Sequence, residues 1–272
     1  MNNTFDLRRF GHLLNKTIYE KRLALLGSFV LLIALSILIY ATGSNARNST
    51  GIQRMVLFFG ILVMPTVVVN ILLDNFSKKS VAASFLTLPC SYFEKWLVVL
   101  VFTALVYLPL FILSFKILDV IFVNHYRDLA VTKWLWNTRQ IENELPYFSL
   151  SFDKPESPLA YLLSNFFTLG AVSMIGSLYF NQKSYIKTTL VGIAIFIIIH
   201  LLASKGMELI IGEKVSIKSL EFTGATVTNE ALRMFPVTAT EPIKSLLNYF
   251  ILLVLPATLW LIGLVRFREK EL

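Results

Sequence analysis

The sequence is poor in the residues that form cross-links or bind metals. Cys90 is the only cysteine among 272 residues, which excludes a disulfide within the chain. His12, His125 and His200 each lack a second ligand at a suitable spacing, so the sequence predicts no metal site. It contains no G-x-S-x-G, H-E-x-x-H or G-x-x-x-x-G-K-[ST] motif. We therefore expect no enzyme and no ATP or other cofactor bound by this chain.

Charged residues are also scarce. They make up 15% of the chain against 56% hydrophobic residues, whereas a soluble domain is about 25% charged. Six runs contain no Asp, Glu, Lys or Arg, namely residues 23–42, 55–73, 96–115, 158–180, 188–204 and 245–265. Each is about the length that crosses a bilayer as a helix, and Tyr185 and Lys187 extend the fifth to 185–204 as interfacial anchors. The sequence predicts an all-α integral membrane protein, a single domain over residues 1–272 with six transmembrane helices.

The distribution of Lys and Arg predicts the orientation. The predicted cytoplasmic segments are 1–22, 74–95, 181–187 and 266–272, and the predicted outer segments are 43–54, 116–157 and 205–244. The former carry 13 of the 25 Lys and Arg residues in 58 positions, and the latter carry 12 in 94. Because basic residues are retained in the cytoplasm, we expect both termini of this multi-pass protein there. The net charge of +8 then indicates contact with membrane lipid and not with nucleic acid.

The residues before the first run predict an amphipathic helix within residues 1–22. Its apolar stripe consists of Leu7, Phe10, Leu14 and Ile18. Basic side chains lie off this stripe, as in helices that lie in the membrane interface. A simple topological anchor is the alternative, and one helix can perform both tasks. The first run is too long for the core of a signal peptide, so we expect it to be retained in the membrane.

Single residues inside the runs carry further predictions. His200 lies in the fifth run, where it either hydrogen-bonds a neighbouring helix as a neutral side chain or takes part in proton or substrate movement. None of the runs holds a carboxylate, which argues against a carrier driven by protons or sodium ions.

Pro65, Pro109 and Pro256 predict kinks in the second, third and sixth runs. Small residues in the fourth run, Gly170, Ser173, Gly176 and Ser177, predict close approach of another helix.

The segment between the second and third runs has its own organisation. A short helix there would place Val81, Phe85 and Leu88 on one side, and Pro89 would end it. Ser91 and Glu94 then form the pattern of a capping box directly before the third run. An apolar stripe exposed in the cytoplasm gains stability by binding a partner surface. The sequence therefore predicts a docking helix followed by a capped start of the third span.

The order of these elements resembles the ABC-2 type transporter permeases, the six-span membrane subunits of ABC exporters. The phrase LPCSYFEKWL, residues 88–97, and the tail RFREKEL, residues 266–272, are similar to permease-like membrane proteins of Bacteroidetes. The resemblance implies a dimer of permease subunits, with the second subunit identical or different. It also implies an ABC ATPase subunit that holds ATP and magnesium, and a location in a bacterial inner membrane. It assigns the coupling role to Ser80, Val81, Phe85, Leu88 and Pro89.

The functional prediction is therefore a permease subunit that couples ATP hydrolysis by a separate subunit to export. A non-transporting polytopic protein that anchors or regulates a cell-envelope complex is the first alternative, and an intramembrane enzyme is the second. In the outer segment 205–244, the alternation in EKVSIKSLEF predicts a strand, and NEALRMF before Pro236 predicts a short helix. Such a segment serves either as an outer gate or as a packed surface cap.

Overall fold

Six helices of the computed structural model are long and apolar enough to cross a membrane, which confirms the predicted helical membrane protein. The structure describes residues 5–42, 49–77, 88–134, 158–180, 184–211, 215–221, 224–229, 234–238 and 240–271. The predicted docking-helix residues Ser80, Val81 and Phe85 lie outside these ranges. So do residues 135–157 of the predicted outer loop.

The first three spans begin with α1 (Leu7–Thr42), a single helix that includes both the predicted amphipathic helix and the first run. The second span consists of α2 (Ser49–Phe58), the π-helical turn η2 (Phe59–Val63) and α3 (Met64–Leu72), followed by the 3-10 turn η3 (Asp74–Ser77). The third span consists of α5 (Tyr92–Val101), the π-turn η4 (Phe102–Tyr107) and α6 (Leu108–Trp134). Helix α6 therefore continues well beyond residue 115, where the charge-free run ends.

The last three spans are α7 (Pro158–Tyr179), α8 (Ser184–Ile211) and a sixth span in three parts. These parts are α9 (Glu241–Tyr249), the π-turn η5 (Phe250–Val254) and α10 (Leu255–Glu271). The basic tail, predicted to follow the sixth span, is thus the last part of α10.

A small antiparallel sheet lies between α8 and α9, in addition to the helices. It consists of β1 (Val215–Glu221), β2 (Gly224–Asn229) and β3 (Met234–Thr238) in the order β1-β2-β3. Strand β1 falls where alternation predicts a strand. The short helix predicted over NEALRMF is wrong at Met234 and Phe235, which pair with Thr228 and Val227 as part of β3.

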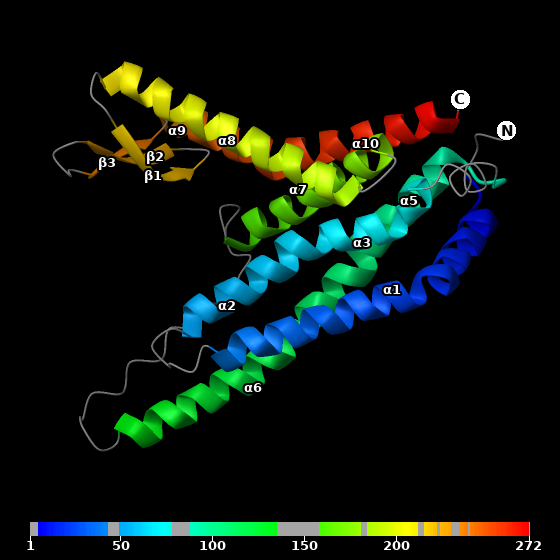
Figure 1. Cartoon of the computed structure of the whole chain (residues 1–272), viewed down its shortest axis with the longest axis horizontal. Helices are drawn as coiled ribbons and strands as arrows, with labels where there is room; N and C mark the ends of the chain where they lie inside the picture. The colour runs from blue at the N-terminus through cyan, green and yellow to red at the C-terminus, as the bar shows by residue number, and fades with distance from the viewer. Residues whose placement is uncertain are drawn as a thin grey trace.

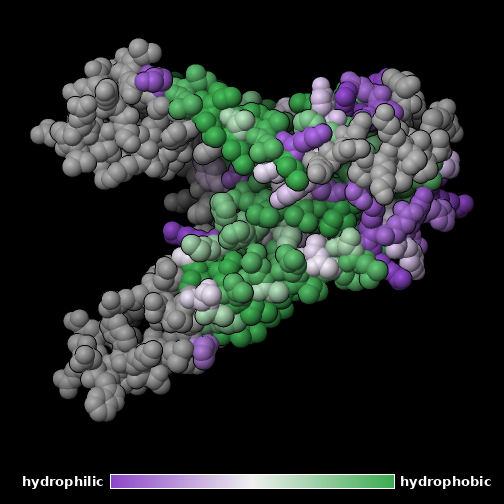
Figure 2. Space-filling model, in the orientation of Figure 1, coloured by the Kyte–Doolittle hydropathy of each residue, from purple (hydrophilic) through white to green (hydrophobic). Residues whose placement is uncertain are grey.

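Both termini lie at the same end of the helix bundle, which we call the termini end (Figure 1). Figure 2 shows hydrophilic residues gathered at this end and a broad hydrophobic surface over the middle of the helices. Many large apolar side chains of the spans are exposed, for example Leu105, Leu190 and Leu253. This pattern is the one expected of a protein whose middle faces lipid.

Helix α7 occupies the centre of the packing, in contact with α3, α8 and α10. The predicted strip of small residues on α7 provides these close contacts. A Cβ atom at Gly176 would overlap Thr188 of α8, and Gly170 lies against Trp260 of α10. Ser173 and Ser177 are buried and reach Asn70 of α3. Small side chains thus let three helices approach α7 closely, as the sequence predicts.

Each of the three span prolines follows a π-turn. Turns η2, η4 and η5 end two residues before Pro65, Pro109 and Pro256, respectively. Proline has no backbone N–H, and its ring clashes with the carbonyl four residues earlier in an α-helix. The wider π-turn relieves this clash because it shifts the hydrogen bonds from i, i−4 to i, i−5. The predicted kinks therefore take the form of π-turns in spans two, three and six.

Candidate functional site

The start of the third span has the capping box that the sequence predicts. The Ser91 hydroxyl accepts a hydrogen bond from the Glu94 N–H at 3.2 Å, and Glu94 Oε2 accepts one from the Ser91 N–H at 2.9 Å. Both side chains are buried, and that of Glu94 is fully so. A buried carboxylate is tolerated only when its oxygens are hydrogen-bonded or paired. The second oxygen of Glu94 therefore needs partners from elsewhere.

Those partners come from the first residues of the chain. Glu94 Oε1 accepts a hydrogen bond from the Asp6 N–H at 2.9 Å and lies 3.4 Å from Arg9 Nη2. The Asp6 side chain in turn accepts a hydrogen bond from the Arg8 N–H at 2.8 Å, within the first turn of α1. One carboxylate therefore caps α5 and also holds the beginning of α1. We call the residues Asp6, Arg9, Ser91 and Glu94 the N-terminal latch.

This contact changes the role of the amphipathic helix. Figure 1 shows that α1 bends between its first turns and its long remainder. The most buried apolar residue of the first turns is Leu13, with Phe10 and Leu14 packed beside it against the core. Leu7 is 75% exposed and Ile18 39% exposed. The predicted apolar stripe is thus divided, since its middle contacts the protein and its two ends are exposed.

The end of the second span is attached to the end of the sixth. Phe76 of η3 packs edge-to-face on Phe267 of α10, with ring centroids 5.9 Å apart, and Lys270 lies over the Phe76 ring. Further in, the Trp96 indole N–H donates to the Trp260 carbonyl at 3.0 Å, which joins α5 to α10. These contacts bring spans two, three and six together at the termini end.

Of the predicted docking helix, the structure describes only its last two residues. Leu88 is half-buried against the core and Pro89 is exposed. The Cys90 N–H donates to the Leu88 carbonyl at 2.7 Å, which forms a tight turn around Pro89. This turn leads directly into the capping box. The segment 78–87 is therefore flanked by Phe76 on one side and by the N-terminal latch on the other.

Two residues of the latch, Glu94 and Arg9, contribute to the electrostatics of the lone cysteine. Partial burial raises the pKa of the Cys90 thiol above its ordinary value, and the Glu94 carboxylate raises it further. Lys95, Arg9 and Lys16 lower this pKa in part because they stabilise the thiolate. The net effect keeps Cys90 a thiol, with less nucleophilic character than an exposed cysteine.

Two side-chain hydroxyls complete the π-turns. In an i, i−5 pattern the N–H of residue 65 would bond the Gly60 carbonyl, but Pro65 has none. The Tyr107 hydroxyl of η4 donates to that carbonyl at 3.0 Å. Likewise, Ile251 lies five residues before Pro256, and its carbonyl accepts from the Ser164 hydroxyl of α7 at 2.7 Å. Side chains from neighbouring spans thus supply the donors that Pro65 and Pro256 lack.

Sequence reasoning missed a buried carboxylate in α6. Asp119 is 1% exposed, and its Oδ1 accepts hydrogen bonds from Tyr40 at 3.1 Å and from Gln53 at 2.6 Å. Its Oδ2 is buried with no hydrogen-bond partner among the described residues. The argument that the spans hold no carboxylate is therefore wrong. The charge-free run ends just before Lys116, so the third span predicted from the sequence stops short of Asp119. The continuing apolar pattern of 117–123 is the signal that could have placed it inside.

A second polar cluster joins spans two, four and five. The Asn70 amide N–H donates to Ser173 at 3.3 Å, and its oxygen accepts from Ser177 at 2.9 Å and from Ser184 at 3.1 Å. His200 lies in α8, but its side chain is outside what the structure describes. Among the described residues, no three His, Cys, Asp or Glu side chains come together as metal ligands. The described polar clusters are thus built for helix contacts.

No protein-family model, curated protein or solved structure matches this chain. The membrane character therefore rests on the six apolar helices. The resemblance to ABC-2 type permeases remains a prediction from the sequence.

Proposed function

We propose that this chain is the membrane-spanning permease subunit of an ATP-driven exporter. A separate ABC ATPase subunit binds ATP and magnesium, and a second permease subunit, identical or different, completes the pathway. In this proposal both termini and the segment 78–91 lie on the cytoplasmic side of a bacterial inner membrane. The chain itself contributes no catalytic residue.

The observation that carries the proposal is the attachment of segment 78–91 at both of its ends. Phe76, just before it, contacts α10 through Phe267. Glu94, just after it, holds both the start of α5 and the start of α1. A force applied to this segment by a partner would therefore reach spans one, two, three and six together, as transmission from an external ATPase requires.

The π-turns support the same proposal from the middle of the membrane. They interrupt spans two, three and six, which are among the spans that the latch and the Phe76 contact would move. Interruptions of this kind are places where helices bend and are frequent at functional sites. In the proposed cycle, ATPase closure displaces segment 78–91, and the helices bend at η2, η4 and η5.

The test attaches a thiol-directed photocrosslinker to Cys90 in inside-out vesicles from the native cell. After illumination, mass spectrometry identifies the protein that is joined to the chain. We expect an ATPase with a Walker A loop. We also expect Phe85→Asp to remove this product while the chain stays in the membrane, because charge would abolish an apolar docking surface. Leu88 is left unchanged because it packs against the core.

The matched control moves the same crosslinker to the other end of the molecule. A Cys90→Ser, Ser219→Cys variant places it on β1, where the exporter proposal predicts no ATPase product. An envelope protein captured from residue 219, together with no ATPase captured from Cys90, would overturn the exporter proposal. That result would favour the anchor of a cell-envelope complex.

A further inference from the structure

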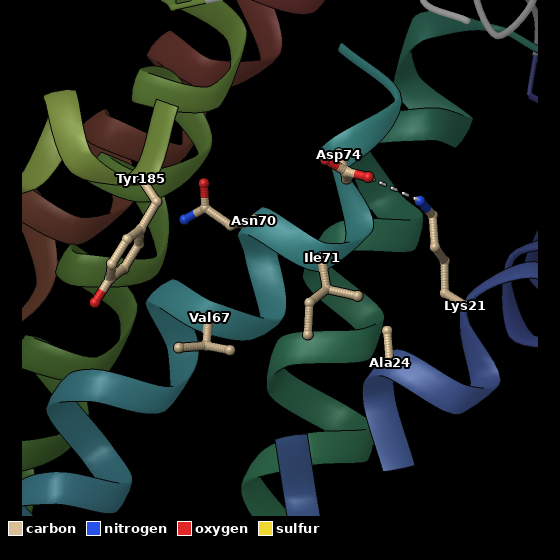
Figure 3. A pocket seen from close by; sticks show the side chains of 7 residues that line it. All are labelled: Lys21, Ala24, Val67, Asn70, Ile71, Asp74 and Tyr185. Atoms are coloured by element: carbon tan, nitrogen blue, oxygen red, sulfur yellow. Dashed lines mark ion pairs between the residues drawn. The ribbon is translucent and has the colours of Figure 1, made fainter. Parts of the chain in front are cut away.

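A cavity of about 360 Å³ lies between α1, α3 and the first turn of α8. Figure 3 shows its lining side chains: Tyr185 lies on one side, and Lys21 and Asp74 face each other on the opposite side. The apolar part of the lining consists of Ala24, Val67 and Ile71. The volume is at the lower end of the range for ligand sites, enough for a headgroup and the first carbons of a chain.

The cavity lies where three spans leave the apolar region at the termini end. Lys21 comes two residues before the charge-free run of α1, and Asp74 comes directly after the run of the second span. Tyr185 is in the first turn of α8. Because charged and amphipathic residues mark the level of lipid headgroups, the polar side of the cavity is at the membrane surface. Its apolar side, one or two turns further along α1 and α3, is at the depth of acyl chains.

The polar groups differ in their freedom to bind a ligand. The side-chain amide of Asn70 is already hydrogen-bonded to Ser173, Ser177 and Ser184. Lys21 Nζ lies 3.8 Å from Asp74 Oδ2, beyond hydrogen-bond distance, so both groups keep hydrogen-bonding capacity. The Lys21 side chain is 17% exposed, and that of Asp74 is 68% exposed. The site thus presents one cation and one anion side by side.

We propose that this cavity binds the headgroup of a zwitterionic phospholipid that carries a primary amine, of the phosphatidylethanolamine type. The phosphate lies beside Lys21, and the ammonium group donates to Asp74. The acyl chains leave along Ala24, Val67 and Ile71. A headgroup with one negative and one positive charge matches a site of the same composition, whereas an anionic headgroup would place its charge against Asp74. A quaternary amine has no N–H to donate to the carboxylate.

The test uses the full-length chain in nanodiscs of phosphatidylcholine with a small fraction of photoactivatable phosphatidylethanolamine or, in parallel, phosphatidylglycerol. Mass spectrometry measures the yield of lipid adducts on peptides that cover residues 21–24 and 67–74. We expect the higher yield from phosphatidylethanolamine. Lys21→Gln should lower the yield of both lipids about fivefold, as expected for one charged contact at a partly exposed site. Asp74→Asn should lower that of phosphatidylethanolamine alone.

Lys16→Gln is the matched control, because Lys16 lies on the same helix in an exposed pair with Glu20 and does not line the cavity. It should leave both yields unchanged. Equal yields from the two lipids in the unaltered chain, or equal losses in the Lys16 and Lys21 variants, would overturn the proposal. The Asp74 variant keeps the test decisive, since an exposed side chain can be exchanged without unfolding the protein. The inference does not depend on the exporter proposal.

Discussion

At the scale of single residues, Glu94 has two structural roles. It completes the capping box of α5 with one oxygen, and with the other it holds Asp6, which directly precedes α1, and Arg9 of the first turn. The capping box was predictable because Ser91 and Glu94 are three residues apart. The contact with Asp6 was not, since nothing local indicates which distant N–H will meet a buried oxygen.

The reactivity of the Cys90 thiol reports on the charges around it. Because its pKa is raised, we expect the rate of alkylation by iodoacetamide to keep rising with pH beyond the ordinary thiol pKa, as the thiolate fraction grows. Lys16→Gln should slow the reaction at a given pH, since it removes a cation that lowers this pKa. The rate is measured by mass spectrometry of the Cys90 peptide in detergent.

Arg268→Gln, at an exposed position of α10 outside the set of charges that act on Cys90, serves as the control and should leave the rate unchanged. A rate that levels off below the ordinary thiol pKa would contradict the assigned environment.

At the scale of elements, the three π-turns show how far sequence reasoning reaches. Pro65, Pro109 and Pro256 are visible in the sequence and predict interruptions of three spans. The donors that replace the missing N–H groups of Pro65 and Pro256 are the hydroxyls of Tyr107 and Ser164, which come from other spans and follow only from the packing. The cavity between α1, α3 and α8 escaped prediction for the same reason, because its residues belong to three distant segments.

We expect Tyr107→Phe to destabilise the protein by about 0.6 kcal/mol and by no more than about 1.7 kcal/mol, the average and the maximum measured for hydrogen bonds between membrane helices. The change removes the hydroxyl that bonds Gly60 and keeps the ring that stacks on Phe166. Ser164→Ala should have an effect of the same size through the Ile251 carbonyl. Unfolding of purified protein by SDS, followed by circular dichroism, measures both.

Thr258→Ala provides a comparison, since this exposed hydroxyl bonds a carbonyl of its own helix. It should cost less than either variant. If all three substitutions have the same effect, the two hydroxyls are not specific donors to the π-turns.

At the scale of the whole molecule, the six spans were the most predictable feature, because a charge-free run of about 20 residues has few other structures available to it. The ends of the helices were less so. Helix α6 continues past Lys116 because one basic side chain with a long apolar stem does not end a span whose apolar pattern resumes at 117–123. The sheet β1–β3 was predicted only in its first strand, since pairing depends on partners that a single segment does not reveal.

Both termini and Cys90 lie at the same end of the helix bundle. An experiment that finds the side of the membrane on which Cys90 lies therefore also locates the termini. We expect a membrane-impermeant maleimide to label Cys90 in inside-out vesicles and not in intact spheroplasts, in accord with the distribution of Lys and Arg. A Cys90→Ser, Ser219→Cys variant, with its thiol on β1, should give the reverse pattern. Labelling of Cys90 from outside would place the termini on the outer face.

The distance along the chain between the two halves of the N-terminal latch has a consequence for biogenesis. Asp6 and Glu94 are 88 residues apart. The first turn of α1 therefore leaves the ribosome well before Glu94 and is fixed only when the third span brings this partner. Until then its charged residues stay free to interact with the insertion machinery and with lipid headgroups, and a bulky fusion placed next to Asp6 would interfere with assembly after insertion.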